Sequence, residues 1–258
     1  MNEGKLYLIG TPIGNLGDIS LRAIETFNKI EVLVCEDSRV SARLINYYFA
    51  KGMIQNKPHY VPYNEFNEDR IFPSIVEMVR NGQKVGLVSD AGMPTISDPG
   101  YPLVRAIIDA RLPIEVIPGP TALTTALPWS GIGGEVALYL GFLPKTSGKA
   151  VKMLESAKMM MEKISSTRVV LYVSPHRLVK DLTMIRGVMG EVHCVLMREL
   201  TKQFEERIEG RVSELIAKYS EKKVKGELVL VLSQQAAAGH GGGFVDSQDF
   251  EDGGSHIC

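Results

Sequence analysis

Residues 6–37 read LYLIGTPIGNLGDISLRAIETFNKIEVLVCED and predict a strand, a helix and a second strand. The first apolar run stops at Gly10, as a buried strand does where a loop begins. Apolar side chains then recur with nearly helical spacing behind Asp18 and Ser20, either of which can cap a helix. A run of strand-forming residues at 32–37 completes a β-α-β unit.

The same pattern recurs along the first half of the chain. Its periodicity predicts helices at about 71–81 and 101–110, and strands at 84–90 and 113–119. Strands separated by helices favour a parallel sheet, because parallel neighbours need crossover connections that cover the sheet. We therefore expect residues 1–119 to form an α/β domain with a mostly parallel sheet and helices on both faces.

A change in the sequence pattern after Gly119 indicates a second domain. Its predicted strands lie at 135–142, 167–174, 192–200, 204–212 and 225–233, and its predicted helices at 150–163, 176–189 and 212–221. This half is denser in strands, with hairpins between some of them, so we expect residues 120–233 to form an α/β domain with a mixed sheet. Residues 234–258 are Gly-rich and acidic, lack apolar periodicity and are expected to be disordered.

Composition excludes two broad classes of protein. With 258 residues, 45% of them hydrophobic and 23% charged, the chain is typical of globular proteins and not of intrinsically disordered ones. The formal net charge is −1, and because residues 233–258 hold four acids and no Lys or Arg, the rest of the chain carries +3. This balance excludes a strongly basic, histone-like nucleic-acid binder but leaves room for a local basic face.

Cysteine usage and hydropathy favour a protein of the reducing cytoplasm. Cys35, Cys194 and Cys258 are odd in number and show no CxxC spacing, so neither a zinc cluster nor a disulfide framework is predicted. The long uncharged stretch at 116–134 is broken by prolines and glycines, which makes it a poor membrane span. We expect a cytoplasmic protein without a metal site or a membrane contact.

Loop-forming and polar sequences follow four of the predicted strands. They are GTPIGNLGD (10–18), EDSR (36–39), SDAGMPTISDPG (89–100) and PGPTA (118–122). Because ligands collect at the carboxyl ends of strands in parallel sheets, we expect a binding site among these loops. The first loop does not have the GxGxxG pattern, which argues against nicotinamide binding. It also lacks the Lys and Ser/Thr pair of a P-loop, which argues against nucleotide hydrolysis.

Several polar residues in these loops suit either a ligand or a structural role. Asp90 can accept hydrogen bonds from a ligand or cap a turn, and the two interpretations are evenly supported. Asp98 precedes Pro99 and is expected to cap a turn or the next helix. Thr121 can cap a helix or contact a ligand, because both roles use the same hydroxyl group.

Two other segments also keep a structural alternative. In SPHR (174–177), His176 could act as a base, but a lone histidine beside a capping Ser174 is expected to be structural. The charged residues of EDSR (36–39) can form a surface ion pair instead of a site, and the cysteine before them is expected to pack within its strand.

Residues 145–168 carry an excess of four positive charges. The cations are Lys145, Lys149, Lys152, Lys158, Lys163 and Arg168, against Glu155 and Glu162. This stretch is a candidate footprint for a phosphate backbone or, alternatively, the solvated face of a helix. The methionine triplet at 159–161 is expected to fill the core.

Eight segments, taken in order, form a characteristic set. They read LYLIGTPIGNLGDISLRA, CEDSR, SDAGMPTISDPGYPLVR, IPGPTAL, GFLP, LYVSPHRL, MRELTK and KGELVLVL. Over residues 5–233 the chain resembles the ribosomal RNA small-subunit 2′-O-ribose methyltransferase I family of the tetrapyrrole methylase superfamily. One departure from the family lies at 63–68, where this chain reads YNEFNE and has Asn64 and Phe66 in place of histidines.

The resemblance implies two α/β domains with S-adenosylmethionine in a cleft between them, and a homodimer. It also implies 2′-O-methylation of a cytidine ribose in the 16S ribosomal RNA of the small ribosomal subunit. The cofactor contacts that it implies are Pro12, Asp90, Ala91, Gly92, Thr95, Thr121, Ala122, Tyr172, Val173, Ser174, Leu200 and Gly226.

Methyl transfer to a ribose hydroxyl requires in-line alignment and removal of a proton from a weak acid. The candidate bases are Glu36, Asp37, Asp90 and Glu199, and the candidate phosphate or oxyanion partners are Arg39, Arg177, Arg198 and Lys202. Two other functions remain open at this point. One is methylation of a tetrapyrrole or a protein side chain, and the other is a non-catalytic module that binds RNA or a nucleotide.

Overall fold

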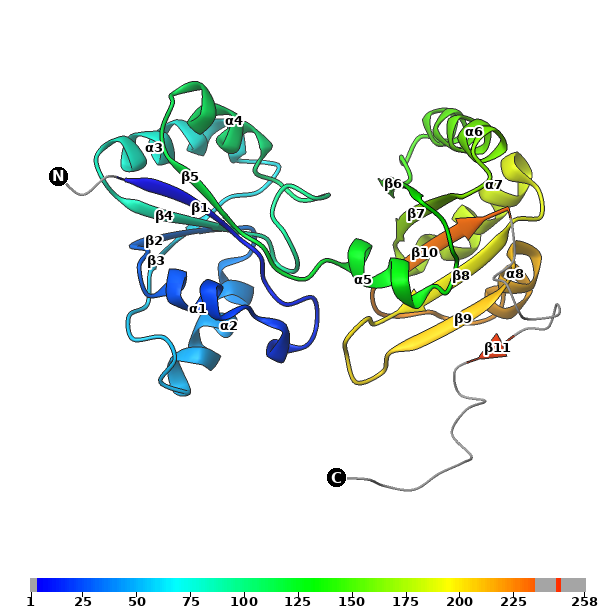
Figure 1. The fold of residues 1–258 in the computed structure, drawn as a ribbon, viewed down its shortest axis with the longest axis horizontal. Coiled ribbons are helices and arrows are strands. Elements are labelled where there is room, and N and C mark those ends of the chain that lie inside the picture. The colour runs from blue at the N-terminus through cyan, green and yellow to red at the C-terminus, as the bar shows by residue number, and fades with distance from the viewer. Residues whose placement is uncertain (1–3, 235–244, 247–258) are drawn as a thin grey trace, which may run out of the picture. The chain divides into compact units, whose positions relative to one another are not determined.

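The computed structural model describes residues 4–234 and 245–246. These residues belong to two compact units, and the boundary between them falls between Thr121 and Ala122 (Figure 1). The disorder predicted for the tail concerns residues that lie, apart from 234 and 245–246, outside the described part of the chain.

The first unit contains a five-stranded sheet in the order β3-β2-β4-β1-β5. Its strands are β1 (Lys5–Ile9), β2 (Val32–Cys35), β3 (His59–Pro62), β4 (Lys84–Val88) and β5 (Ile114–Ile117). All four pairings are parallel, so the carboxyl ends of the strands share one edge of the sheet. The prediction of an α/β unit with a mostly parallel sheet is confirmed.

Four helices cover the two faces of this sheet (Figure 1). Helices α1 (Leu21–Phe27) and α2 (Ser38–Ala50) pack on one face, and α3 (Glu68–Arg80) and α4 (Tyr101–Asp109) pack on the other. Ser20 caps α1, because its hydroxyl accepts a hydrogen bond from the Ala23 amide at 3.1 Å. A 3-10 turn, η1 (Leu16–Asp18), precedes that cap.

The second unit contains a six-stranded sheet in the order β11-β9-β8-β10-β7-β6. Its strands are β6 (Val136–Phe142), β7 (Thr167–Val173), β8 (His193–Arg198), β9 (Glu206–Arg211), β10 (Leu228–Ser233) and β11 (Val245–Asp246). Strand β6 runs parallel to β7, and the other pairs are antiparallel. The predicted mixed sheet is therefore confirmed.

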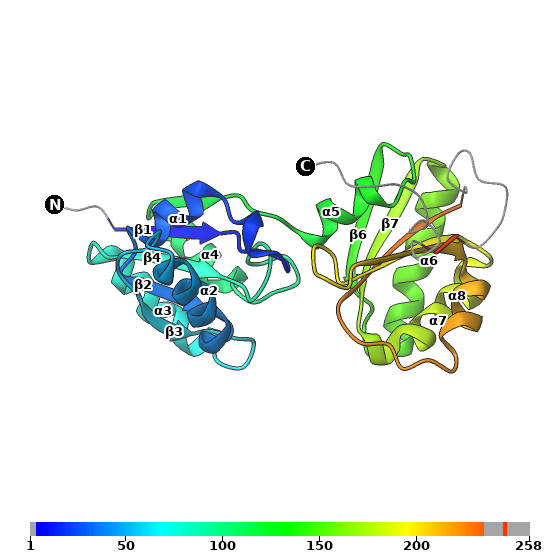
Figure 2. The same ribbon diagram turned by 90° about the horizontal axis from the view of Figure 1, so that it is seen from below.

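Three helices bury one face of the second sheet (Figure 2). They are α6 (Ser147–Lys163), α7 (Leu178–Met189) and α8 (Val212–Tyr219), and the 3-10 turn η2 (Pro175–Arg177) leads into α7. Helix α5 (Ala122–Trp129) contacts β10. In the part of the chain that the structure describes, no helix is long and apolar enough to span a bilayer.

The methionine triplet of α6 corrects one prediction. Only Met161 is buried, whereas Met159 is 53% exposed and Met160 is 38% exposed. Three consecutive residues of a helix spread over most of its circumference, because each is turned about 100° from the last. They therefore cannot all face the sheet.

Candidate functional site

The carboxyl edge of the first sheet brings the loops after β1 and β4 into direct contact. The Thr11 amide donates to the Gly92 carbonyl at 2.8 Å, and the Gly92 amide donates to the Thr11 carbonyl at 3.1 Å. The buried Thr11 hydroxyl lies 3.3 Å from the Gly92 carbonyl and 3.4 Å from that of Ser89. Pro12 is buried beside this junction, so the two loops form one rigid unit.

The loop after β5 joins the same edge through a contact between two glycines. A methyl group on Gly10 would lie 2.6 Å from the Cα and N atoms of Gly119, and 2.7 Å from the Met93 sulfur. A side chain at either glycine would push the two backbones apart, because real Cβ atoms essentially never approach so closely. Thr121 follows, buried, and Ala122 is the first residue of α5.

The loop SDAGMPTISDPG is held in an unusual backbone conformation. Thr95 and Ser97 have positive φ values of 71° and 65°, and Gly92 and Gly100 have 84° and 129°. For a β-branched residue such as Thr95 this left-handed conformation is strained, and strain of this kind concentrates at functional sites. The Thr95 side chain is exposed and therefore accessible to a ligand.

Asp90 connects the loop after β4 to the loop after β2. Its Oδ1 atom accepts a hydrogen bond from the Asp37 amide at 3.0 Å, and the residue is otherwise exposed. Asp37 caps α2 and pairs with Arg39 at 2.6 Å, and the hydrogen bond from Arg39 lowers the pKa of Asp37 to about 2. The Arg39 side chain is 87% exposed, so Asp37 and Arg39 form a surface ion pair, which is the structural alternative for EDSR (36–39).

Three neighbouring carboxyl groups at this edge have raised pKa values. Partial removal of the carboxyl group from water is the main cause for Glu36, Asp90 and Asp98, and in each case a nearby carboxylate adds to it. The pKa of Asp98 rises to about 6. A positively charged ligand would lower all three values, because an opposite charge favours the ionised form.

Asp98 does not cap the next helix, which corrects that part of its prediction. The N-cap residue of α4 is Gly100, which has no side chain and a φ of 129°. The Asp98 carboxyl group instead interacts with the Ser89 hydroxyl. The loop therefore turns once more after Asp98, and the helix starts too late for this carboxylate to reach its first turn.

The first unit fits S-adenosylmethionine on two counts. Carboxyl groups that lack full compensation suit a cofactor carrying a sulfonium and an ammonium group, and glycines let backbone atoms approach a ligand closely. Four of the implied cofactor contacts, Asp90, Ala91, Gly92 and Thr95, lie together in one loop. Among residues 4–234 and 245–246 no group of three His, Cys, Asp or Glu side chains is arranged to hold a metal ion.

In the second unit, Glu199 and Gly226 lie against each other at the ends of β8 and β10. Glu199 has a φ of 54°, and its Oε1 atom accepts hydrogen bonds from the Glu227 amide and from Lys202 Nζ, both at 2.9 Å. A methyl group on Gly226 would lie 2.6 Å from that oxygen. Leu200 is buried next to them, so four predicted site residues share one cluster.

Lys202 fixes the charge state of this cluster. Its ammonium group lies 2.9 Å from Glu199 and 3.0 Å from Glu227. Burial by itself would raise the pKa of Glu199, but the hydrogen bonds from Lys202 and the Glu227 amide outweigh burial and lower it. Glu199 is therefore held ionised and can act as a proton acceptor.

The three predicted contacts at the end of β7 differ in what they offer a ligand. The Tyr172 hydroxyl accepts a hydrogen bond from the Leu123 amide at 3.2 Å. Val173 packs into the hydrophobic core and can contact a ligand only through its backbone. Ser174 occupies the N-cap position of η2 without a capping hydrogen bond, so its predicted capping role is wrong and its hydroxyl is not used there.

Arg177 and Arg198 are engaged within their own unit. Arg177 donates to the carbonyls of Leu143 and Pro144 at 3.0 and 3.3 Å, and pairs with the buried Asp181 at 3.0 Å. Arg198 pairs with Glu206 at 2.6 Å. These bonds give both guanidinium groups a structural role.

Three residues of these clusters were missed from the sequence. Thr11 and Ser89 supply buried hydroxyl groups directly after or next to strand ends, and Glu227 supplies the second carboxylate on Lys202. A small hydroxyl residue at the end of a buried strand is the signal that could have indicated the first two. Glu227 gives no such signal, because it precedes its strand.

Comparison with known families matches the chain to the Tetrapyrrole (Corrin/Porphyrin) Methylases over residues 5–216. The chain therefore belongs to this family of methyltransferases, which use S-adenosylmethionine as methyl donor. The uroporphyrin-III C-methyltransferase of Thermus thermophilus, solved with S-adenyl homocysteine, shares the fold with a TM-score of 0.61 and 18% identity, over 90% of this chain and 98% of that one. Cobalt precorrin-4 methyltransferase has a TM-score of 0.59 and 15% identity, with 89% and 94% covered.

Closer relatives narrow the family further. A protein of Thermotoga maritima named ribosomal RNA small subunit methyltransferase I is 38% identical over 89% of this chain and 98% of its own length. Proteins of the same name from Mycoplasmopsis pulmonis and Bacillus subtilis are 40% and 37% identical, over 88% and 89% of this chain and 96% and 75% of their own. The chain belongs to the ribosomal RNA small subunit methyltransferase I family, and the resemblance seen in its motifs is confirmed.

Proposed function

We propose that this protein transfers a methyl group to the 2′-hydroxyl of a cytidine ribose in 16S ribosomal RNA. The identity of 35–40% to proteins named small subunit methyltransferase I, over about nine-tenths of this chain, is the observation that supports this substrate best. The tetrapyrrole methylases of known structure are only 15–20% identical, so they support the fold and not a tetrapyrrole substrate.

Pro12, Asp90, Ala91, Gly92 and Thr95 are the residues of the first unit that we assign to S-adenosylmethionine, which supplies the methyl group. One carboxylate oxygen of Asp90 accepts a hydrogen bond from the Asp37 amide, and the exposed part of the carboxylate can interact with a positively charged group. The backbone of Gly92, fixed against Thr11, offers a rigid surface without a Cβ atom. Thr121 and Ala122, together with Tyr172, Val173, Ser174, Leu200 and Gly226, remain predicted contacts.

Glu199 and Lys202 are the pair that we assign to the hydroxyl proton. An ionised carboxylate close to an ammonium group can accept a proton while the ammonium group stabilises the negative charge that develops on the attacking oxygen. General-base assistance of this kind contributes about 100- to 10,000-fold in rate. Glu36 and Asp37 remain candidate bases in the first unit: Asp37 pairs with Arg39, and burial raises the pKa of Glu36, which makes its carboxylate a stronger base.

Membership of the family also supports a proposal for the location of the protein, its oligomeric state and the form of its RNA substrate. We expect a cytoplasmic homodimer that acts on the small ribosomal subunit. The assembled subunit is the expected substrate because the chain outside its tail has a net charge of only +3, which is modest for binding free RNA. Assembled subunits would supply additional contacts. Comparison of 30S particles with free 16S RNA as substrates distinguishes the two.

The test is transfer of a labelled methyl group to 30S particles from a strain that lacks the modification. We expect label in one cytidine ribose of 16S RNA, located by nuclease digestion and mass spectrometry. Labelling of uroporphyrinogen III but not of 30S particles would replace the proposal with a tetrapyrrole methylase. A folded protein without affinity for S-adenosylmethionine in calorimetry would instead be a binding module.

A further inference from the structure

The end of β6 presents an aromatic side chain that the proposed chemistry does not use. Phe142 is 51% exposed, and its ring lies against that of Tyr172 with a centroid distance of 5.7 Å and an interplanar angle of 69°. Tyr172 contacts Tyr139 in the same way, at 5.2 Å and 69°. Three aromatic rings therefore form a cluster with one open face.

An irregularity in β6 creates this cluster. The pairing of β6 with β7 shifts by one residue between Tyr139 and Gly141, and Gly141 has a φ of 63°. In a regular strand, residues three apart point to opposite faces of the sheet. The bulge turns Phe142 to the same face as Tyr139, away from the α6–α8 core, as bulges near functional sites often do.

The cluster is rigid behind its exposed ring. The Tyr172 hydroxyl accepts a hydrogen bond from the Leu123 amide, and this bond fixes the tyrosine ring at the start of α5. Leu171 and Val173, on either side of Tyr172, are buried in the core. An exposed ring held by fixed neighbours loses little side-chain entropy when a planar group stacks on it.

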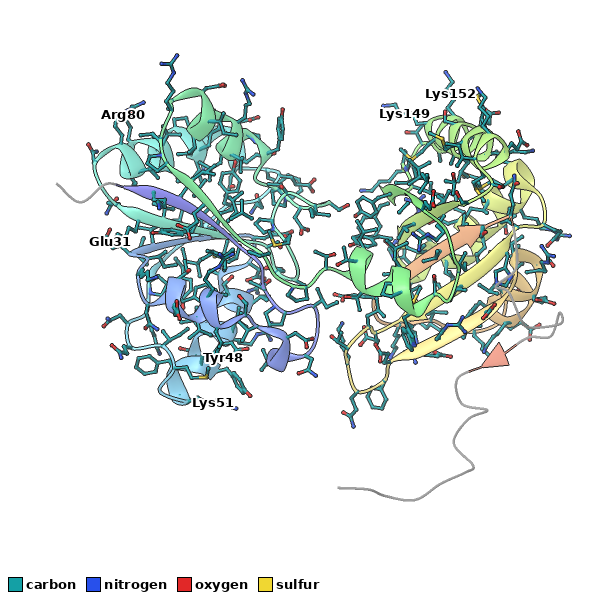
Figure 3. The ribbon with its side chains drawn as sticks, in the orientation of Figure 1. Glu31, Tyr48, Lys51, Arg80, Lys149 and Lys152 are labelled. Carbon is teal, nitrogen blue, oxygen red and sulfur yellow. The ribbon has the colours of Figure 1, made fainter. Side chains whose placement is uncertain are left out.

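A strongly basic surface begins three residues after Phe142. Residues 145–152 read KTSGKAVK and carry three lysines and no acid. Lys149 and Lys152 project from the outer surface of α6, as Figure 3 shows, and all three lysines are exposed. In the part of the chain that the structure describes, none of the three lies within 4.0 Å of a carboxylate.

The spacing of these lysines separates them from the core face of their helix. Residues three apart lie on the same side of a helix, so Lys149 and Lys152 are neighbours. Ala150 and Leu154 face the sheet and are buried. A stripe of positive charge thus runs from the β6–α6 connection onto the outside of α6.

We propose that the β6–α6 segment, residues 142–152, binds single-stranded ribosomal RNA, with Phe142 stacking on a nucleobase and Lys145, Lys149 and Lys152 contacting phosphates. This inference rests on the proposed function and assigns a substrate-binding surface to it. Proteins that bind single strands combine stacking side chains with a cationic track along the backbone, which are the two features found here. The cofactor fits this surface less well, because its sulfonium group carries a positive charge and would be repelled by the lysines.

Binding of a short fluorescein-labelled single-stranded RNA of mixed sequence, followed by fluorescence anisotropy, tests the inference without requiring catalysis. We expect Phe142→Ala to raise Kd about 5- to 150-fold, the range for removal of one base-aromatic stack. Phe142→Trp should bind as the wild type does, and Phe142→Leu should bind weakly, because leucine keeps apolar bulk but has no ring. Phe49→Ala, at another exposed ring, is the matched control.

The lysines are tested by salt dependence. Each phosphate contact to a single strand contributes about 0.7 to the slope of log Kd against log salt. The double variant Lys149→Gln, Lys152→Gln should therefore lower the slope by about 1.4. Lys222→Gln, Lys223→Gln removes the same charge from the exposed turn after α8 and should leave the slope unchanged.

Two results would overturn the inference: an unchanged RNA Kd in Phe142→Ala, and an equal loss of slope in the Lys222/Lys223 control. If the RNA Kd is unchanged and the affinity of Phe142→Ala for S-adenosylmethionine is weaker, the ring belongs to the cofactor site. A wild-type protein that binds RNA at this surface but methylates no 30S particle would refute the proposed function alone.

Discussion

Gly226 lies directly against the carboxylate of Glu199, and the absence of a side chain at Gly226 is what allows this contact. The two residues come from different strand ends, and both have positive φ values, 93° and 54°. The neighbouring Glu227 amide completes the arrangement by donating to the same carboxylate oxygen at 2.9 Å. The position of the candidate base is therefore set by the backbone of another segment.

Gly226→Ala should lower both stability and activity. The added methyl group would lie 2.6 to 2.7 Å from the Glu199 side chain, and alanine is strained at a φ of 93°. We expect a loss of about 1 to 3 kcal/mol in the free energy of unfolding, measured by urea denaturation. Gly148→Ala, where nothing lies within 4 Å, should not destabilise the protein. Equal stability of both variants would contradict the steric account.

Glu199→Gln should slow methyl transfer while preserving the fold. It keeps the size of the side chain but removes its charge, so we expect a kcat lower by about 100- to 10,000-fold on 30S particles. Since Lys202 holds the pKa of Glu199 below its ordinary value, this group stays ionised and should not cause the wild-type rate to fall between pH 8 and pH 6. Glu221→Gln, on an exposed turn, is the control, and a normal kcat in Glu199→Gln would exclude Glu199 as base.

Asp90→Asn should weaken cofactor binding without disturbing the loop. Asparagine keeps an oxygen that can accept the Asp37 amide, so the variant removes charge and preserves this hydrogen bond. We expect the Kd for S-adenosylmethionine in calorimetry to rise about 10- to 100-fold, as for loss of a hydrogen bond to a charged group. Asp109→Asn, which alters an exposed pair on α4, should bind normally. Unchanged affinity in Asp90→Asn would give Asp90 a purely structural role.

Asp98→Asn should stabilise the unliganded protein, and more so at higher pH. The Asp98 pKa is about 6 in the folded state against 3.8 in the reference, so the folded state binds this proton more tightly and stability falls as pH rises through that window. The variant removes this cost, and its advantage should grow by about 1 to 1.5 kcal/mol between pH 5 and pH 7.5. Urea denaturation at both values measures it, and an advantage independent of pH would show that Asp98 does not titrate there.

Affinity for S-adenosylmethionine should depend on the same protons. A cationic ligand beside Glu36, Asp90 and Asp98 favours their ionised forms, so binding releases protons and tightens as pH rises from 5 to 7. Calorimetry in two buffers of different ionisation enthalpy detects the release. Proton uptake on binding would contradict the placement of the cofactor at this edge.

The sequence allowed the strand ends to be located because apolar runs stop abruptly at glycine, proline or acid. Helix α2 and strand β3 were not predicted. The helix buries only three side chains along 13 residues, and β3 is a short edge strand that ends in proline, so neither has a strong apolar period. Elements that are stabilised mainly by tertiary contacts show little periodicity of apolar residues in the local sequence.

The site residues divide in the same way. The loop around Asp90 could be found because loop residues follow an apolar strand, whereas the role of Gly226 depends on Glu199, which lies 27 positions earlier in the chain. The bonds of Arg177 to Leu143 and Pro144 also join distant segments. Pairings of this kind are set by the sheet register, which a single sequence does not reveal.

The extra residue in β6 has a consequence for how this strand can change over time. Deletion of Leu140 together with the bulge would leave Phe142 two positions after Tyr139, and residues two apart share a face, so the ring would stay outside the helical layer. Replacement of Gly141, which has a φ of 63°, by a β-branched residue would instead favour a regular strand of unchanged length, in which Phe142 faces the helices. Glycine at position 141 is therefore the property of this strand that natural variation should preserve.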